Sequence, residues 1–226
     1  MGVGLPSDII NLMRKTPFVK GEYYHIYNRG VEKRNIFSDQ HDLNRFFQSM
    51  KEFNVVEPIG SIYEHSFIQL GSRTSKSDKL VNLICYCLNP NHYHFILEPV
   101  IDKGIEKFMQ RLGGGYTNYF NNKHKRNGVL FQGKFKARHV NSDLLNISVY
   151  VNLNNYVHQL GSRSPKLYKS SWDEYKGKNR ENFCYKDIIL EQFENSNEYA
   201  SFAKDALEGI LERKKEKEEV KSLLIE

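Results

Sequence analysis

Short runs of β-forming residues alternate with helical patterns along most of this chain. The runs over 22–28, 81–88, 92–100 and 134–140 predict four strands, and the turn Asn89-Pro90-Asn91 joins the middle two as a hairpin. Apolar residues at helical spacing predict helices from Asp39, over 104–123 with an interruption at the three glycines 113–115, and after Ser142. This order predicts an α+β fold: a ferredoxin-like, split βαβ antiparallel sheet with its helices on one face.

The segments outside this pattern suggest how the chain is divided. Residues 1–20 are expected to form an irregular arm and residues 21–160 the main domain, with an excursion at 54–79 that is rich in polar and turn-forming residues. Residues 161–226 are expected to form a helical C-terminal extension that ends in a charged helix from about residue 197. The thin apolar stripe of that helix suits either the core of this chain or a second copy, so a homodimer stays open.

Composition favours some classes of protein and argues against membrane proteins and disulfide-stabilised proteins. The chain has 33 Lys and Arg against 27 Asp and Glu, a net charge of +6, which favours a polyanionic partner. No run approaches the roughly 20 apolar residues that span a bilayer, and no signal peptide is evident, so we expect a soluble cytoplasmic protein without a membrane partner. The three cysteines are too few for a disulfide framework and are expected to be small buried residues.

Positive charge is concentrated in one part of the chain. Residues 107–142 contain eight cations and no acidic residue, and six aromatic residues are interleaved with those cations. This mixture is typical of surfaces that bind a phosphate backbone and stack unpaired bases. The alternative is that the aromatic residues belong to the core and the charges form an ordinary solvated face.

Two pairs of residues could carry chemistry. His92 and His94 stand at i and i+2 on a predicted strand, so both rings project from one face, as two ligands of one metal would. Tyr150 and Asn154 stand at i and i+4 on a predicted helix, which places a phenol and an amide oxygen one turn apart. Neutral oxygen and imidazole ligands suit Mg²⁺ or Mn²⁺ acting on phosphate, and Zn²⁺ is also compatible. Structural roles for all four residues remain the alternative.

Four motifs occur in the order found in REP-associated tyrosine transposases, which belong to the HUH single-tyrosine transposases. The chain resembles that family over residues 22–175. The motifs are Tyr24-His25-Ile26-Tyr27-Asn28-Arg29-Gly30, Asn89-Pro90-Asn91-His92-Tyr93-His94, residues 128–137 (GVLFQGKFKA) and Tyr150-Val151-Asn152-Leu153-Asn154.

The resemblance implies both a site and an activity. It assigns the nucleophile to Tyr150 and the divalent metal to His92, His94 and Asn154, with Tyr116 and Tyr119 as less favoured rival nucleophiles. The implied enzyme is a metal-dependent transposase and endonuclease that nicks and rejoins single-stranded DNA, flanked by hairpin repeats, through a 5′-phosphotyrosine. Its setting would be the nucleoid of a bacterial or archaeal cell. The competing hypotheses are a non-catalytic module that binds single-stranded DNA or RNA, and a domesticated descendant of a transposase.

Charge and motifs together indicate which residues contact DNA. The expected contacts are Arg29, Lys33, Arg34, Arg111, Tyr116, Lys123, Lys125, Arg126, Gln132, Lys134, Lys136 and Arg138.

The chain departs from the family pattern at two places. Asn155 stands where the family usually has proline after the asparagine of the tyrosine helix, so we expect that helix to continue past Asn154. The excursion at 54–79 is longer than usual, and it leaves DNA specificity and any dimer surface undecided.

Overall fold

The computed structural model describes residues 17–60, 62, 78–158, 167–178 and 182–223. Most of the predicted N-terminal arm and of the excursion, residues 1–16, 61 and 63–77, lie outside this part of the chain. Within it, no helix is both long enough and apolar enough to cross a membrane.

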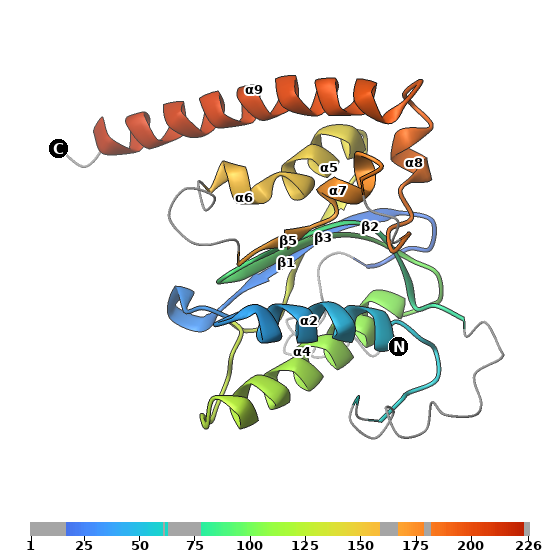
Figure 1. Cartoon of the computed structure of the whole chain (residues 1–226), viewed down its shortest axis with the longest axis vertical. Helices are drawn as coiled ribbons and strands as arrows, with labels where there is room; N and C mark the ends of the chain where they lie inside the picture. Colours follow the sequence, from blue (N-terminus) through green and yellow to red (C-terminus); the bar gives the residue numbers. More distant parts are fainter. Residues whose placement is uncertain (1–16, 61, 63–77, 159–166, 179–181, 224–226) are drawn as a thin grey trace, which may run out of the picture.

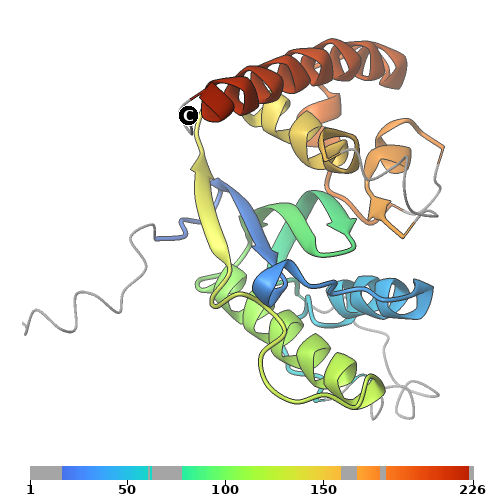
Figure 2. The same cartoon turned by 90° about the vertical axis from the view of Figure 1, so that its left-hand side faces the viewer.

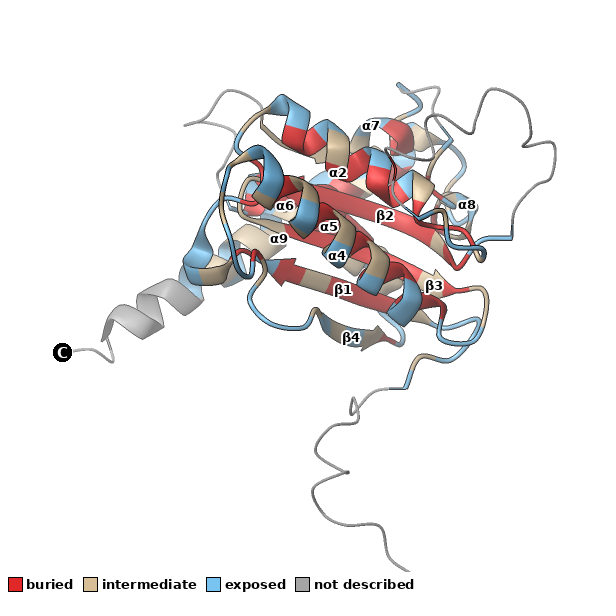
Figure 3. Cartoon of the chain, turned by 90° about the horizontal axis from the view of Figure 1, so that it is seen from below, coloured by how far each residue is buried: buried red, intermediate tan, exposed pale blue. Residues whose placement is uncertain are grey.

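A five-stranded antiparallel sheet forms the centre of the fold, in the order β4-β1-β3-β2-β5. Its strands are β1 (Tyr23–Arg29), β2 (Val81–Asn89), β3 (His92–Pro99), β4 (Lys136–Val140) and the short β5 (Lys169–Ser170). The predicted α+β class and antiparallel sheet are therefore confirmed. Figure 2 shows β4 at the edge of the sheet, and Figure 3 shows the three inner strands buried between helical layers.

One face of the sheet is covered by the two helices predicted between the strands, α2 (Gln40–Glu52) and α4 (Gly104–Lys123) (Figure 1). Alternate strand residues, among them Ile26, Tyr93 and Phe95, point into this layer and are buried with the apolar faces of both helices. A 3-10 turn, η1 (Val31–Lys33), follows β1.

The other face is also covered, by the tyrosine helix as well as by the C-terminal extension, so the helices of the predicted domain do not all lie on one face. It carries α5 (Leu144–Asn152), α6 (Asn154–Val157), α7 (Trp172–Tyr175), α8 (Asp187–Leu190) and α9 (Ser196–Leu223), with α9 outermost (Figure 1). The reason is apolar surface on both sides of the strands: Ile84, Cys85 and Ile96 face this layer and are fully buried there. Burial of all three cysteines agrees with the prediction.

The glycines at 113–115 do not interrupt α4, contrary to the prediction. A Cβ added at Gly115 would lie 2.7 Å from ring atoms of Phe53, which is closer than such contacts occur. Glycine at this position therefore allows close packing of the helix against Phe53 and does not break the helix.

The C-terminal helix folds back on its own domain. Tyr199 and Ala203 of α9 are fully buried against α5 and α7, and the Lys214 ammonium donates a hydrogen bond to the Val157 carbonyl at 2.7 Å. The apolar stripe as far as Ile210 therefore packs against this chain's own core.

A buried carboxylate joins the two helices of the first layer. Asp42 of α2 accepts hydrogen bonds from Lys123 Nζ at 2.8 Å, from His124 Nε2 at 2.9 Å and from the Ser38 N–H at 2.9 Å. Burial favours the protonated acid, but these donors outweigh it and hold the Asp42 pKa below its usual 3.8. The carboxylate thus fixes the end of α4 against the start of α2.

Replacing Asp42 with Asn should lower the free energy of unfolding by about 2–3 kcal/mol at pH 7, because Lys123 and His124 lose a buried charged partner. The depressed pKa means that this contribution is fully present at neutral pH and is lost as the pH falls below 3.8. Urea unfolding measures both effects. Asp173→Asn, which breaks the exposed pair with Lys176, should cost about 0.5 kcal/mol or less. Equal losses for the two variants would contradict this account.

Candidate active site

The register of β1, β3 and β4 gathers polar residues at one end of the sheet. His94 lies opposite Tyr27, which in turn lies opposite Lys136, and His92 lies opposite Arg29. Opposed residues of antiparallel strands project from the same face. His25, two residues before Tyr27, shares this face, as does Asn89, which lies opposite His92. The α5 side of the sheet is therefore apolar at one end and rich in imidazoles at the other.

A helix break brings Asn154 to these histidines. α5 ends at Asn152, Leu153 leaves helical conformation (φ −109°, ψ 19°), and α6 begins at Asn154. The prediction that the tyrosine helix continues past Asn154 is therefore wrong. The backbone N–H groups of Asn154 and Asn155 donate to the buried Cys87 thiol on β2, which accounts for the donors that the break sets free.

His92 Nε2 and Asn154 Oδ1 lie close together and both face the side-chain amide of Asn89. His92 Nε2 lies 3.0 Å from Asn154 Oδ1, and the Asn89 amide nitrogen donates to both, at 2.9 and 2.8 Å. The other nitrogen, His92 Nδ1, donates to Asn91 Oδ1 at 2.6 Å. In the tautomer that makes this bond, Nε2 carries the lone pair that a metal ligand requires.

His94 is oriented by a histidine that the sequence analysis did not single out. Its Nδ1 lies 2.8 Å from His25 Nε2, and the two rings stack with centroids 5.1 Å apart. When His94 Nδ1 is the donor, its Nε2 carries a lone pair and makes no hydrogen bond to any residue in the described part of the chain. Burial, together with the nearby His25, His92 and His158, holds the His94 pKa well below its usual value, so the ring is neutral at pH 7.

Tyr150 of α5 packs against His94 and His25. Its ring lies edge-on to His94, with centroids 5.6 Å apart, and to His25 at 5.9 Å. Burial raises the pKa of the phenol, and the neighbouring Asn154 side chain acts in the opposite direction. The phenol is therefore protonated at neutral pH and must lose its proton if it is to attack.

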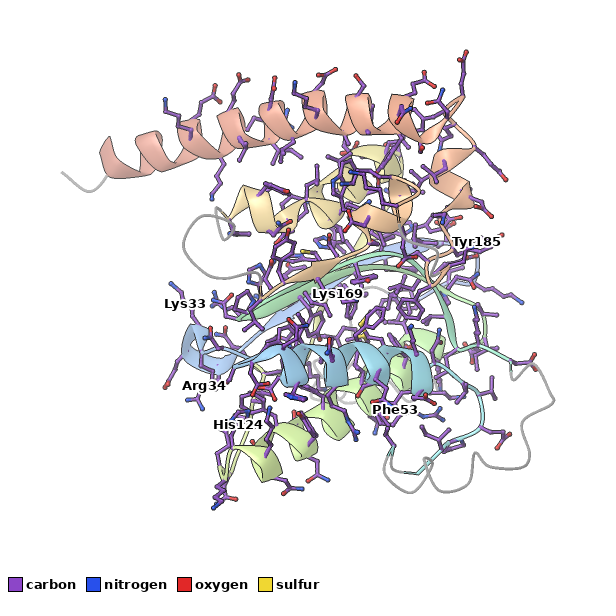
Figure 4. The ribbon with its side chains drawn as sticks, in the orientation of Figure 1. Lys33, Arg34, Phe53, His124, Lys169 and Tyr185 are labelled. Carbon is purple, nitrogen blue, oxygen red and sulfur yellow. The ribbon has the colours of Figure 1, made fainter. Side chains whose placement is uncertain are left out.

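A cavity of about 560 Å³ opens on these groups and is lined by His92, His94, His158 and Tyr150. Four of the expected DNA contacts line it as well: Arg29, Lys33, Gln132 and Lys136. Lys33 lies at the end of the molecule that carries α6 (Figure 4). The cations of this cavity could bind the negative charge of a phosphodiester, which would then lie next to the neutral imidazoles and the Tyr150 phenol.

The donor set fits a divalent ion of modest charge. Among the described residues no three His, Cys, Asp or Glu side chains group as metal ligands, so an ion here would depend on two imidazoles and an amide oxygen. The 3.0 Å between His92 Nε2 and Asn154 Oδ1 matches the separation of two adjacent ligands at about 2.1 Å in octahedral geometry. At present the Asn89 amide group donates to both atoms, so an ion would displace that contact.

The comparison with known families agrees with the predicted resemblance. The family model described as "Transposase IS200 like" matches residues 18–154, more than half of the chain. The chain belongs to this family. Its members are transposases, which cleave DNA and transfer strands. The four motifs that carry the predicted resemblance all lie within the matched range.

Other comparisons add little. No curated protein matches the chain. Among solved structures, it is similar to one described as a REP-associated tyrosine transposase bound to a REP hairpin, with 12% identity, a TM-score of 0.46, and coverage of 74% of this chain and 86% of that one. A likeness of this extent gives no further information about function.

Not every expected DNA contact of this transposase is available to DNA. Tyr116 is fully buried and its hydroxyl donates to the Ile36 carbonyl at 2.6 Å, so the prediction that it contacts DNA is wrong. As a rival nucleophile it is excluded for the same reason. Tyr119 bonds to Asp42 on the opposite side of the sheet from the histidines, so it is also excluded.

Several of the expected cations have protein partners. Lys123 is held by Asp39 and Asp42, Arg111 donates to the carbonyls of Val55 and Val56, and Arg126 donates to Asn121 and to the Val129 carbonyl. Because each contact would have to be broken before DNA could bind, Lys123 and Arg111 are better explained as structural residues.

The remaining expected contacts are exposed. Lys134 lines a separate groove beside α4, and Lys125 lies in the turn that follows α4. Arg34 pairs loosely with Glu32, and Arg138 lies opposite His25 on the histidine face of β4.

Four residues of the site were not predicted from the sequence: His25, Tyr27, Asn89 and His158. His25 and Tyr27 stand in the first of the four motifs, and their i, i+2 spacing on a strand repeats that of His92 and His94, which was the available signal. His158 lies with its ring centroid 4.9 Å from that of His92. Nothing local in the sequence distinguishes it.

Stability should fall in mild acid because the site holds neutral histidines. Burial lowers the pKa of His25 from 6.5 to about 4, so between these values the unfolded chain binds a proton that the folded chain does not. The free energy of unfolding should therefore drop by as much as about 1.4 kcal/mol per pH unit for this residue as the pH falls through that window. His25→Gln, which cannot titrate, should reduce the slope measured by urea unfolding between pH 6.5 and pH 4. An unchanged slope would contradict a neutral, buried His25.

Proposed function

We propose that this chain cleaves and rejoins single-stranded DNA, with Tyr150 as nucleophile and a 5′-phosphotyrosine as intermediate. The observation that carries the proposal is convergence: Tyr150, His92 and His94 line one cavity, Asn154 meets His92 at its wall, and three cations surround the opening. Proteins that only bind nucleic acid need the cations but have no use for a tyrosine set among neutral imidazoles.

In this reaction the Tyr150 oxygen forms a bond to the scissile phosphorus as the bond from phosphorus to the 3′ oxygen breaks. The products are a phosphotyrosine on the 5′ side and a free 3′-hydroxyl. Because one phosphoester replaces another, a second 3′-hydroxyl can reverse the step and join new ends. The exchange needs no nucleotide cofactor.

His92, His94 and Asn154 would hold the divalent ion, Mg²⁺ or Mn²⁺. When bound, the ion supplies positive charge that polarises the scissile phosphate and lowers the cost of forming a phenolate. The chain contributes positioning: Asn91 bonds to His92 Nδ1, His25 orients His94, and the helix break aims Asn154 at His92.

The cations of the cavity would hold the strand. Lys33 and Lys136 line the cavity and form no ion pair with any residue that the structure describes, so they suit phosphates. Arg29 is bonded to Gln132, which places a guanidinium and an amide at the rim. A narrow cavity with Tyr27 in its wall suits an unpaired strand better than a duplex. A hairpin flanking the cleaved strand is part of the proposal on the strength of the four motifs.

Tyr150→Phe should abolish covalent attachment and leave DNA binding within about twofold, because only the nucleophilic oxygen is removed. The measurement is intact mass of the protein after incubation with Mn²⁺ and a single strand that carries a hairpin. Tyr27→Phe is the matched control, since Tyr27 lines the same cavity and stacks on His94 at 5.6 Å. If the adduct persists in Tyr150→Phe and disappears in Tyr27→Phe, Tyr27 is the nucleophile and the proposal fails.

Asn154→Ala should raise the Mn²⁺ concentration required for half-maximal adduct formation at least tenfold, because an oxygen ligand is lost. Removing divalent ions with EDTA should stop attachment by the wild-type protein. Asn146→Ala serves as the control, since Asn146 is an exposed asparagine of α5 that bonds to Asp143. Equal Mn²⁺ requirements for Asn154→Ala and wild type would remove Asn154 from the metal site.

A further inference from the structure

A second cavity lies along α6, the helix whose first residue, Asn154, contacts His92. It has a volume of about 330 Å³, and its wall includes Asn155 and Tyr156 of α6, Trp172 and Lys176 of the α7 region, and Lys169 of β5. Asn155 directly follows Asn154, so one short helix carries both a residue of this cavity and the asparagine that contacts His92. The volume is at the small end of the range for ligand pockets, and suits one planar group rather than a duplex.

Asn155 is the unusual member of this wall. It is 1% exposed, yet its amide nitrogen and its amide oxygen both lack a hydrogen-bond partner in the described part of the chain. Folded proteins pair the large majority of such buried groups. One unpaired donor beside one unpaired acceptor is the pattern that the edge of a nucleobase complements, and asparagine is a frequent reader of base edges.

The rest of the wall suits the ring of a nucleobase. Tyr156 is 49% exposed, Tyr168 also lines the cavity, and Lys176 Nζ lies 5.2 Å from the centre of the Trp172 ring. Bases stack on aromatic rings of this kind. The two lysines have partners of their own: Lys176 Nζ lies 3.1 Å from the carboxylate of Asp173, which also lines the cavity, and Lys169 Nζ lies 4.3 Å from the centre of the Phe47 ring. Lys169 is at the β5 edge of the sheet, and Figure 4 shows it well separated from Tyr185.

We propose that this cavity binds a single unpaired base of the DNA strand close to the cleaved phosphate, with Asn155 reading its edge and the aromatic wall stacking on its ring. The proposal rests on the proposed function, since it takes the strand to run past Tyr150. It adds a source of sequence specificity that the catalytic residues do not supply.

The test is an abasic scan. Oligonucleotides that lack one base at a time on either side of the cleaved position are titrated against protein carrying Tyr150→Phe, so that binding is measured without cleavage. Loss of the base at one position should weaken binding about tenfold. When Asn155→Leu is added, that penalty should shrink to about twofold or less, and the penalties at other positions should stay unchanged.

Two further variants separate recognition from folding. Asn155→Leu should leave Tm unchanged or raise it, because it removes two unpaired buried groups at similar volume. Tyr156→Ala should reduce the same abasic penalty, whereas Tyr185→Ala, which removes a tyrosine of matching exposure (51%) elsewhere, should not.

The outcomes that overturn the proposal are distinct from failure of the proposed function. An abasic profile that is identical with and without Asn155→Leu overturns it, as does a large drop in Tm, which would show that the amide is structural. If wild-type protein forms the adduct but no position depends on Asn155, only the base pocket fails. If the protein binds none of the oligonucleotides, both proposals fall.

Discussion

The pairing register between β1 and β3 is the constraint on which the site depends. It places His94 opposite Tyr27 and His92 opposite Arg29, with His25 close enough to bond to His94. Side chains alternate between the two faces of a strand, so a slip of one residue would turn all of these groups into the α2 and α4 layer. Ile26, Tyr93 and Phe95, which fill that layer, hold the register through their burial.

Burial makes the histidines chemically useful and costs stability. Desolvation keeps the imidazoles neutral, so their nitrogens can act as ligands at neutral pH, but each takes up a proton when the chain unfolds in acid. The amide nitrogen of Asn154 and both polar atoms of the Asn155 amide are also buried, without partners among the described residues. Unsatisfied groups concentrated around one short helix are typical of a binding region whose partners arrive with the ligand.

Local patterns in the sequence predicted four of the five strands, the two inner helices and the pair His92 and His94, because period and turn chemistry are encoded within a few residues. The two-residue β5 is too short to leave such a pattern. The second helical layer was missed because β2 carries apolar residues on both faces, and a run of that kind does not show what covers it. The break at Leu153 was missed because the donors it frees are bonded by Cys87, more than 60 residues away in the sequence. The same limit explains Tyr116: its helical spacing was visible, but its bond to Ile36 was not.

The central claim is that His92, His94 and Asn154 enclose one ion beside Tyr150. Crystals of the protein soaked in Mn²⁺ and measured at the manganese absorption edge test it most directly. The account predicts an anomalous peak within bonding distance of His92 Nε2, His94 Nε2 and Asn154 Oδ1, with the Asn89 amide withdrawn from between them. A map without a peak there, in which Asn89 still bonds to His92 and Asn154, would contradict it.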